Sequence, residues 1–581
     1  MINYKFSEII RLNSDLEEKV KYNPLLELRL LSNITINQLT PIYEYYLRHN
    51  DLNAKITVGD YDNILQESGN LPEKTIPVIF WELSNLKDSF VYEIESFDED
   101  KIKLFSEKIK SELNLLFQNT KKSALVIFNK FSHLVFTNSN LKKRNFENFV
   151  IRLNQYLEET APSNFILIDI DKIFANLSVR ASVDFRNYYA TKALYTVEFF
   201  KAYTLLTSPL FFSMFSKTKK ALIFDCDNTL WKGVVGEDGY ENIELSNQSK
   251  NGVYFREVQL LAKSLASQGV IIGICSKNNP EDVEEVFRMR TDMSLIASDI
   301  VIKKVNWVDK AANLSEIASE LNIGIDSLVF VDDSDFEVNL VRESLPQIHT
   351  IQVSKNLYEY PKLIFDQMDL FYASNTSLED LNRGTMYKEN LERSKIKNSY
   401  QDIGDYILSL GIKVAFFNKE GDHLARIAQM TQKTNQFNLT TKRYSITDIQ
   451  YFYESNHYDV ISIEVSDKFG NSGVTGVGVV SYDGNGGAEI DTLLLSCRVL
   501  GRNIETEFIN EIIKTVKTRN VKYLKAKYIK TFKNAQVANF YEKNHFEAIE
   551  SNDSGTSYCL KLDNCHIDNS VNGIEILWKK K

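Results

Sequence analysis

The segment KALIFDCDNTLW, residues 220–231, decides the fold class of this chain. Its first half is an apolar run typical of a buried strand, and it leads directly into Asp225, Asp227 and Thr229. Two carboxylates two positions apart at a strand tip can divide the work of phosphoryl transfer, because one can attack phosphorus while the other donates a proton. The segment therefore predicts a reactive strand end in an α/β domain.

Three further polar segments follow, each at the end of an apolar strand or the start of a helix. VIIGICS ends in Ser276, KAANLSEIASEL begins with Lys310, and SLVFV runs into Asp332 and Asp333. A hydroxyl can hold a phosphoryl oxygen, and a lysine can screen the repulsion between phosphate and carboxylate. An acidic pair suits Mg²⁺, which prefers oxygen ligands.

This constellation resembles the haloacid dehalogenase superfamily, whose motifs are an aspartate nucleophile in DxDxT, a Ser or Thr, a Lys and an acidic pair. The resemblance implies Asp225 as nucleophile, Asp227 as acid and base, Ser276 as phosphate ligand and Lys310 as the cation. It further implies a Mg²⁺ ion held by Asp225, Asp332 and the backbone carbonyl of Asp227. Thr229, Asn278 and Asp333 are predicted to contact the substrate, and Asp333 is also a candidate to support the metal.

Two neighbouring lysines, Lys303 and Lys304, are rivals for the role of the cation. Lys310 is the better candidate because it starts a helix before the last strand. The intervals between the motifs hold only the flap GVVGEDGYENIELS, a helix near 254–268, another helix and short strands. Neither interval has room for a folded cap, so we expect a capless, open site whose substrate is large or carried on a macromolecule.

Longer stretches sharpen the resemblance. DCDNTLWKGVVGEDG, SKNNPEDV, NWVDKAANLSEIA and VFVDDSDFE are similar to the FkbH-like subfamily, as are QMTQKTNQFNLTTKRYS (429–445) and IDTLLLSCRVLGRNIE (490–505). This resemblance implies that the enzyme dephosphorylates a phosphorylated three-carbon acid, 1,3-bisphosphoglycerate being the prime candidate. It also implies transfer of the glyceryl unit to an acyl carrier protein as a thioester, in secondary-metabolite biosynthesis. The alternative is a small-metabolite phosphatase with a non-catalytic docking domain.

A thiol is the natural holder of an acyl group, and two cysteines compete for that role. Cys226 lies between the two aspartates, and Cys497 ends an expected strand next to Arg498, a cation that a thiolate would need. For each of them a buried packing role is about equally consistent with the sequence.

The last part, from residue 411, has the order β-β-β-α-β-α-β and is similar to the GNAT acyltransferase fold. Arg498, Gly501 and Arg502 resemble its pyrophosphate loop, and FYEK (540–543) resembles its late signature. Amides at a helix start next to glycine permit close approach of phosphate, so these residues are candidates for binding the phosphopantetheine of a carrier. A plain strand-to-helix turn explains the loop equally well.

The first part reads as apolar strands separated by amphipathic helices, which predicts a flavodoxin- or SGNH-like parallel sheet. The expected strands are 26–31, 54–58, 76–81, 124–128 and 165–170. No Gly-rich phosphate loop or Gly-Asp-Ser motif follows the first strand, so we assign this domain no chemistry. The expected domains are 1–217, 218–373 of haloacid dehalogenase type, a helical linker 374–410, and 411–581.

Composition and charge limit the partners and the compartment that we expect for this protein. The 581 residues include only nine prolines and 23 glycines, and the net charge is −10, which argues against nucleic acid as a partner. The five cysteines form no CxxC pair, which favours a reducing compartment. The first 20 residues have no apolar core of a signal peptide, and no apolar run is long enough to span a bilayer. We therefore expect a cytoplasmic protein without a membrane partner.

Overall fold

The structure is a computed structural model that describes the chain except for residues 1–3, 22, 73, 138–141, 143, 374–377, 398, 485, 532, 564, 566–572 and 580–581. Residues 374–377 and 398 of the predicted linker therefore lie outside the described residues. The chain divides into two compact units, with the boundary between Phe211 and Phe212. Among the described helices, none combines the length and the apolarity of a membrane span.

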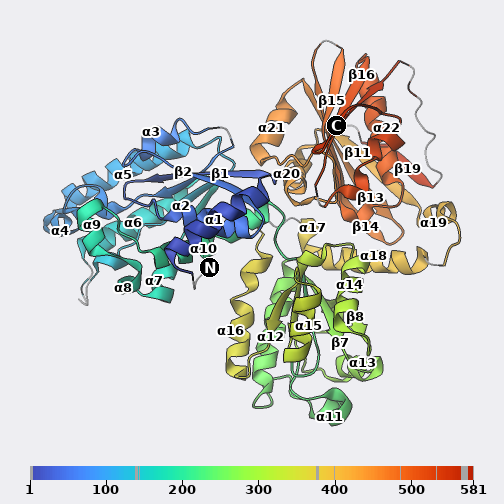
Figure 1. Ribbon diagram of the computed structural model, residues 1–581, viewed down its shortest axis with the longest axis horizontal. Helices are drawn as coiled ribbons and strands as arrows, with labels where there is room; N and C mark the ends of the chain where they lie inside the picture. The colour runs from blue at the N-terminus through green and yellow to red at the C-terminus, as the bar shows by residue number, and fades with distance from the viewer. Residues whose placement is uncertain are drawn as a thin grey trace. The chain divides into compact units, whose positions relative to one another are not determined.

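The first unit is built on a five-stranded parallel sheet in the order β2-β1-β3-β4-β5. Figure 1 labels β1 and β2 of this sheet. Its strands are β1 (Leu25–Ser32), β2 (Asn53–Val58), β3 (Ile76–Phe80), β4 (Val126–Asn129) and β5 (Phe165–Ile168). Its helices are α1 (Phe6–Val20), α2 (Leu39–His49), α3 (Ile64–Ser68), α4 (Phe90–Glu93), α5 (Glu99–Asn119), α6 (Asn145–Thr160), α7 (Asp171–Leu177), α8 (Val179–Ser182), α9 (Phe185–Thr191) and α10 (Val197–Met214).

Successive residues of these strands face opposite sides of the sheet, which is why the strands are apolar throughout. Ile79 packs with α3, α5 and α6, whereas the next residue, Phe80, lies against Tyr203 of α10 with ring centroids 4.8 Å apart. Helices therefore cover both faces, and the predicted parallel sheet domain is confirmed.

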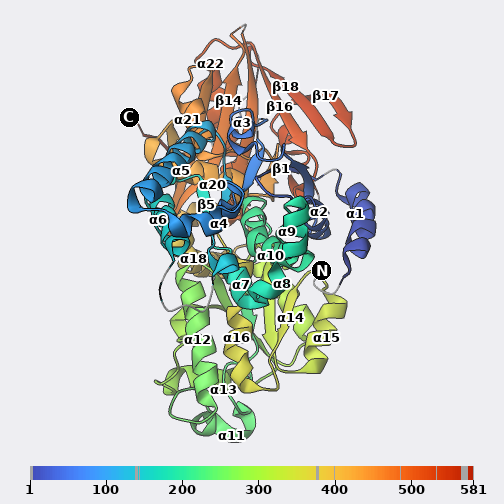
Figure 2. The same ribbon diagram turned by 90° about the vertical axis from the view of Figure 1, so that its left-hand side faces the viewer.

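The second unit begins with another five-stranded parallel sheet, in the order β10-β9-β6-β7-β8. Its strands are β6 (Ala221–Phe224), β7 (Ile271–Ser276), β8 (Ile300–Val305), β9 (Leu328–Asp332) and β10 (His349–Gln352). Its helices are α11 (Val235–Asn242), α12 (Gly252–Ser267), α13 (Pro280–Met289), α14 (Lys310–Glu320), α15 (Asp335–Ser344) and α16 (Tyr360–Phe365). Leu222 and Phe224 pack towards α12 and α16, which lie side by side in Figure 2, and Ala221 and Ile223 pack towards α14.

The loops of this sheet agree with the predicted absence of a cap. The described residues between Thr229 and Ser276 form only α11, α12 and β7, and those between Ser276 and Lys310 form α13, a short 3₁₀ turn and β8. The short helix α17 (Leu378–Leu381) and the longer α18 (Arg383–Lys397) follow the sheet.

The C-terminal part is a nine-stranded, mostly antiparallel sheet in the order β17-β18-β16-β15-β14-β13-β11-β19, with β12 paired to β15. Its strands are β11 (Ile412–Asn418), β12 (Phe437–Asn438), β13 (Tyr458–Asp467), β14 (Gly470–Tyr482), β15 (Gly487–Leu495), β16 (Tyr523–Ile529), β17 (Glu547–Asn552), β18 (Gly555–Lys561) and β19 (Ile574–Trp578). Its helices are α19 (Ile403–Leu410), α20 (Leu424–Lys433), α21 (Ile446–Glu454), α22 (Ile504–Lys517) and α23 (Phe540–Lys543).

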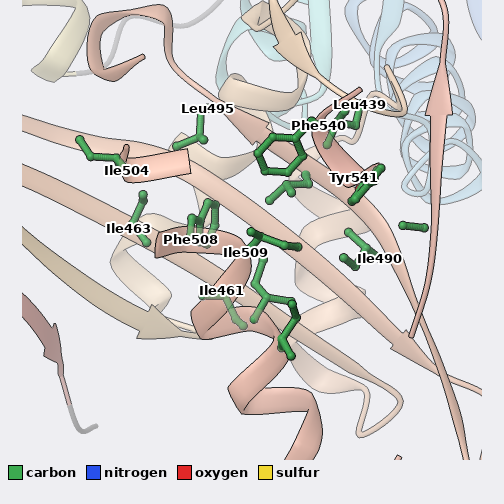
Figure 3. Close-up of a cluster of buried hydrophobic side chains, with 14 of the residues drawn as sticks. Leu439, Ile461, Ile463, Ile490, Leu495, Ile504, Phe508, Ile509, Phe540 and Tyr541 are labelled. Carbon is green, nitrogen blue, oxygen red and sulfur yellow. The ribbon is translucent and has the colours of Figure 1, made fainter. Parts of the chain in front are cut away.

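The core of this part lies between the sheet and α22. Figure 3 shows Phe508 and Ile509 of α22 against the strand residues Ile461 and Ile463, all of them fully buried. Helix α22 follows β15 as the order β-β-β-α-β-α-β predicts, whereas the second helix of that order is split into a 3₁₀ turn at Ala535–Val537 and the short α23. The mixed α/β fold class inferred from the sequence is confirmed.

Candidate active site

The four predicted segments meet at one edge of the β10-β9-β6-β7-β8 sheet. Strands β6, β7 and β9 are parallel neighbours, so their carboxyl ends share that edge, and α14 begins beside them. The backbone N–H of Asp225 donates to the carbonyl of Val331 at 2.9 Å, which holds the tips of β6 and β9 together. Nζ of Lys310 lies 3.0 Å from Oδ1 of Asp225 and 2.5 Å from Oδ2 of Asp332.

All three of these side chains are buried, with exposed fractions of 6% for Asp225, 3% for Lys310 and 0% for Asp332. Burial alone would lower the pKa of Lys310, but the charges of the two carboxylates outweigh it and raise that pKa, so the lysine stays protonated. Burial and the nearby Asp225 raise the pKa of Asp332, against the opposing effect of Lys310. The site thus concentrates negative charge around one fixed cation.

The carboxylates of this site fit a divalent metal. Asp225, Asp332 and Asp333 each offer an oxygen, and these atoms all lie within 4.8 Å of one another. Burial, followed by the charge of Asp225, raises the pKa of Asp333, as expected for acids that crowd together. Oxygen ligands of this kind are those that Mg²⁺ takes up, while it keeps several waters.

The side chain of Asp227 is held by three hydrogen bonds. Its Oδ1 accepts from Nε1 of Trp231 at 2.9 Å and from the backbone N–H of Val235 at 3.1 Å, and its Oδ2 accepts from Nδ2 of Asn278 at 2.9 Å. Burial raises the pKa of Asp227, although the hydrogen bonds lower it. A fixed carboxyl group with a raised pKa is suited to carry a proton.

Two more predicted residues complete the edge. Ser276 ends β7, and its Oγ lies 3.2 Å from Nδ2 of Asn278, so one amide joins the serine to Asp227. Thr229 is fully buried, and its Oγ1 finds no hydrogen-bond partner among the described residues. Its carbonyl accepts from the hydroxyl of Tyr360 at 3.0 Å, which fixes the loop after the strand tip.

The rival lysines of the sequence point elsewhere. Lys303 pairs with Glu284 at 2.7 Å, and Lys304 pairs with Glu316 at 2.9 Å, both on helices that flank β8. Of these three described lysines, only Lys310 forms an ion pair with Asp225.

One contribution to the site was not predicted from the sequence, and another was predicted in a different role. Trp231 is not among the predicted site residues, yet its indole Nε1 donates to Oδ1 of Asp227. Asp333, which the sequence predicts to contact the substrate or to support the metal, lies with Asp225 and Asp332 as a candidate direct ligand. The pair Asp332-Asp333 carried the signal for the second contribution, and the four-residue separation of Asp227 and Trp231 was too common a spacing to identify the first.

Side chains of this chain contact the loop that the sequence predicts to bind phosphopantetheine. The guanidinium of Arg502, 6% exposed, lies 3.4 Å from Oδ2 of Asp467. The N–H of Gly501, whose φ is +75°, donates to Oε1 of Glu505 at 2.6 Å. The side chain of Arg498 reaches Oγ of Ser496 at 3.2 Å. In this arrangement the Gly501 amide and the Arg502 guanidinium both face carboxylates of this chain, so phosphopantetheine binding by the loop stays a prediction.

The two candidate thiols have different surroundings. Cys226 is fully buried in the core of the β6 sheet, and burial raises its pKa well above that of a free thiol. Cys497 is half-buried, and its carbonyl accepts from Nδ2 of Asn322 at 2.9 Å. Asn322 follows α14, whose first residue is Lys310, and eleven helical residues span about 16 Å. Cys497 therefore lies at the end of α14 away from the carboxylates.

One solved structure with a similar fold contains a phosphatase domain. No protein-family model matches the chain, and no curated protein matches it. The chain is similar to the N-terminal part of the protein BF1531 from Bacteroides fragilis, which contains a phosphatase domain and was crystallised with Mg. The two are 25% identical with a TM-score of 0.55, and the match covers 64% of this chain and 100% of the other.

Acetyltransferase structures match a smaller share of the chain. A protein from Desulfovibrio desulfuricans assigned to the GNAT family is 14% identical over 26% of this chain and 99% of its own, with a TM-score of 0.22. The ribosomal-protein-S18-alanine N-acetyltransferase from Escherichia coli is 11% identical over 27% of this chain and 99% of its own, with a TM-score of 0.21.

Proposed function

We propose that the chain is a Mg²⁺-dependent phosphohydrolase of the haloacid dehalogenase type, with Asp225 as its nucleophile. The observation that carries the proposal is the position of Lys310, whose Nζ lies between the carboxylates of Asp225 and Asp332, with Asp333 completing a cluster of three acids. A dianionic phosphate approaches a carboxylate only where cations screen the repulsion, and this site supplies one cation and ligands for another. The Mg-bound phosphatase domain of the Bacteroides fragilis protein supports the same proposal.

The residues divide the reaction into two displacements. A carboxylate oxygen of Asp225 attacks phosphorus, the bond from phosphorus to the ester oxygen breaks, and the leaving oxygen takes a proton from Asp227. A water molecule then gives its proton to Asp227 and attacks the aspartyl phosphate, which releases inorganic phosphate and restores Asp225. Ser276 and Lys310 hold the transferred phosphoryl oxygens. When bound, Mg²⁺ would be held by Asp225, Asp332 and Asp333 and would stabilise the charge on phosphate.

For the substrate we propose a phosphorylated three-carbon acid, as the FkbH-like resemblance implies, with an acyl carrier protein as the acceptor of a glyceryl unit. The chemistry assigns two separate steps to this reaction. Attack of Asp225 on the phosphorus of an acyl phosphate would release a free carboxylate, which cannot form a thioester. Thioester formation instead needs a thiol that attacks the carbonyl carbon and expels phosphate. We therefore assign the phosphate ester of 1,3-bisphosphoglycerate to Asp225 and the acyl phosphate to a thiol.

A plain small-metabolite phosphatase is the second candidate, and three observations favour it. Cys226 is buried, Cys497 lies away from the carboxylates, and the loop at Gly501 is closed by Glu505. In this alternative the C-terminal domain serves as a docking surface and captures no acyl group.

One experiment separates the two functions. The protein is incubated with 1,3-bisphosphoglycerate, Mg²⁺ and a holo acyl carrier protein, and phosphate release is measured together with the intact masses of both proteins. Glyceryl addition to the carrier supports the transferase, and phosphate release without any acyl addition supports the phosphatase. An Asp225→Asn variant that still releases phosphate from the ester refutes both. Loading by Cys497→Ser and by Cys226→Ser at the wild-type rate excludes a covalent role for those thiols.

A further inference from the structure

The first unit contains a cavity at the point where its strand order reverses. In open α/β sheets, ligands bind outside the carboxyl ends of the strands at such a reversal. Strand β1 has β2 on one side and β3 on the other, so the reversal lies between β1 and β3. A cavity of about 250 Å³ lies there, with Asn33 directly after β1 and Trp81 directly after β3 among its lining residues.

Hydrogen bonds between the ends of β1 and β3 fix the floor of the cavity. Nδ2 of Asn33 donates to the carbonyl of Glu82 at 2.9 Å, and Oδ1 of Asn33 accepts from the N–H of Glu82 at 2.7 Å. These two bonds join the ends of β1 and β3. Asn33 and Trp81 are almost completely buried, with exposed fractions of 2% and 6%, so the floor is rigid.

The walls combine apolar surface with acidic groups. Helices α3 and α5, which lie on one face of the sheet (Figure 1), contribute Ile64, Leu65, Phe105 and Ile109. The charged lining residues are Asp62, Glu112 and Lys108, and Nζ of Lys108 lies 3.8 Å from Oε1 of Glu112. Asp62 lies at the exposed rim of the cavity and Glu112 is half-buried; partial burial raises the pKa of both acids, and the charge of Asp62 adds to the shift of Glu112. One negative charge in this cavity is therefore left without a compensating lysine among the lining residues.

We propose that this cavity binds a small organic cation, an ammonium or guanidinium group on a short apolar or aromatic body. The cationic group would lie between Asp62 and Glu112, where it relieves the repulsion of the two carboxylates. The body would lie against Trp81 and Phe105, whose rings also attract a cation. The cavity is smaller than the pockets of drug-sized ligands, which limits the ligand to about the size of one ring with a short chain.

The test uses the full-length protein and three probes of the same shape. Calorimetric titration with 2-phenylethylamine, 2-phenylethanol and 3-phenylpropionate compares a cation, a neutral molecule and an anion. We expect the amine to bind at least tenfold more tightly than the other two, because hydrogen bonds between charged groups are stronger than those of neutral groups. Equal binding of the three probes, or no binding of the amine, overturns the proposal.

Variants of the lining residues are expected either to weaken or to strengthen amine binding. Asp62→Asn and Glu112→Gln are expected to weaken amine binding about tenfold each, whereas Lys108→Met should strengthen it because a competing cation is removed. Glu107→Gln is the matched control, since Glu107 is an exposed residue of the same helix paired with Lys110. Thermal unfolding of each variant checks that it folds. An equal loss of affinity in Glu107→Gln, or a loss in Lys108→Met, contradicts the proposal, and neither result bears on phosphate release at Asp225.

Discussion

Asn278 donates a hydrogen bond from its Nδ2 to Oδ2 of Asp227 at 2.9 Å. The same amide lies 3.2 Å from Oγ of Ser276, so one side chain sets the distance between the proposed proton carrier and a proposed phosphate ligand. Asn278 is 5% exposed, which leaves it little freedom to reorient. We infer that Asn278 positions Asp227 for proton transfer.

Replacing Asn278 with alanine should lower kcat for phosphate release by about 10- to 100-fold and change KM little. The physical reason is that Asp227 loses one of its three hydrogen bonds and with it a fixed orientation towards the leaving oxygen. Steady-state assays of phosphate release against substrate concentration measure both constants. Asn279→Ala is the control because Asn279 is exposed and bonds to Asp282 and Trp307 outside the carboxylate cluster. An unchanged kcat in Asn278→Ala would show that Asp227 needs no such support.

The sequence was sufficient to predict the meeting of Asp225, Lys310 and Asp332. Each lies at the end of an apolar strand or the start of a helix, and parallel strands bring their carboxyl ends to one edge whatever the details of packing. The sequence could not predict the bond from Trp231 to Asp227, because it depends on the loop between them. The sequence also could not predict that Arg502 and the Gly501 amide contact Asp467 and Glu505, because these acids lie in an ordinary strand and an ordinary helix.

Binding of Mg²⁺ should stabilise the protein against heat. Without the ion, Asp225, Asp332 and Asp333 repel one another within 4.8 Å, and a ligand that binds only the folded state shifts the unfolding equilibrium. At 100 times its Kd the ion adds about 2.7 kcal/mol, which corresponds to a rise in Tm of roughly 5–10 °C for a domain of this size. Scanning fluorimetry with Mg²⁺ and with EDTA measures the rise.

Two variants separate the acids that would hold the ion from a nearby acid that would not. Asp333→Asn should raise Tm in EDTA, because it removes a repelling charge, and should reduce the rise caused by Mg²⁺. Asp335→Asn should do neither, since Asp335 is exposed and lies outside the cluster of three acids. A Mg²⁺ response that Asp335→Asn diminishes as strongly as Asp333→Asn would place the ion elsewhere.

Lys310 should contribute to stability as well as to catalysis. Replacing it with methionine leaves the buried Asp225 and Asp332 without their cation, and breaking a buried ion pair from one side costs about 3–5 kcal/mol. Urea unfolding in EDTA measures this loss of unfolding free energy. Lys303→Met should change stability by no more than about 0.5 kcal/mol, because its partner Glu284 is 60% exposed and solvent screens the pair.

A double variant isolates the coupling between the two groups. If Asp332 and Lys310 interact as the 2.5 Å contact indicates, Lys310→Met combined with Asp332→Asn should lose less stability than the sum of the single variants. Strict additivity would mean that the measured loss in Lys310→Met comes from packing and not from charge.

The first unit should lose stability as the pH rises through neutrality. Burial raises the pKa of Glu82 from 4.5 to about 7, and its Oε1 accepts a hydrogen bond from the hydroxyl of Tyr195. The folded state therefore holds a proton that the unfolded state releases near pH 4.5, so the stabilisation is complete below that pH and lost as the pH passes 7. A shift of this size corresponds to about 3 kcal/mol.

Replacing Glu82 with glutamine removes the titration while keeping an oxygen for Tyr195. We expect the free energy of unfolding of the wild type to fall by about 2–3 kcal/mol between pH 5 and pH 8 relative to Glu82→Gln, with urea titrations at each pH as the measurement. Glu159→Gln is the control because Glu159 is exposed, and its pH profile should follow the wild type. If the profiles of the wild type and Glu82→Gln are parallel, the carboxyl group of Glu82 carries the same charge in the folded and unfolded chain, and burial at the end of β3 does not hold its proton.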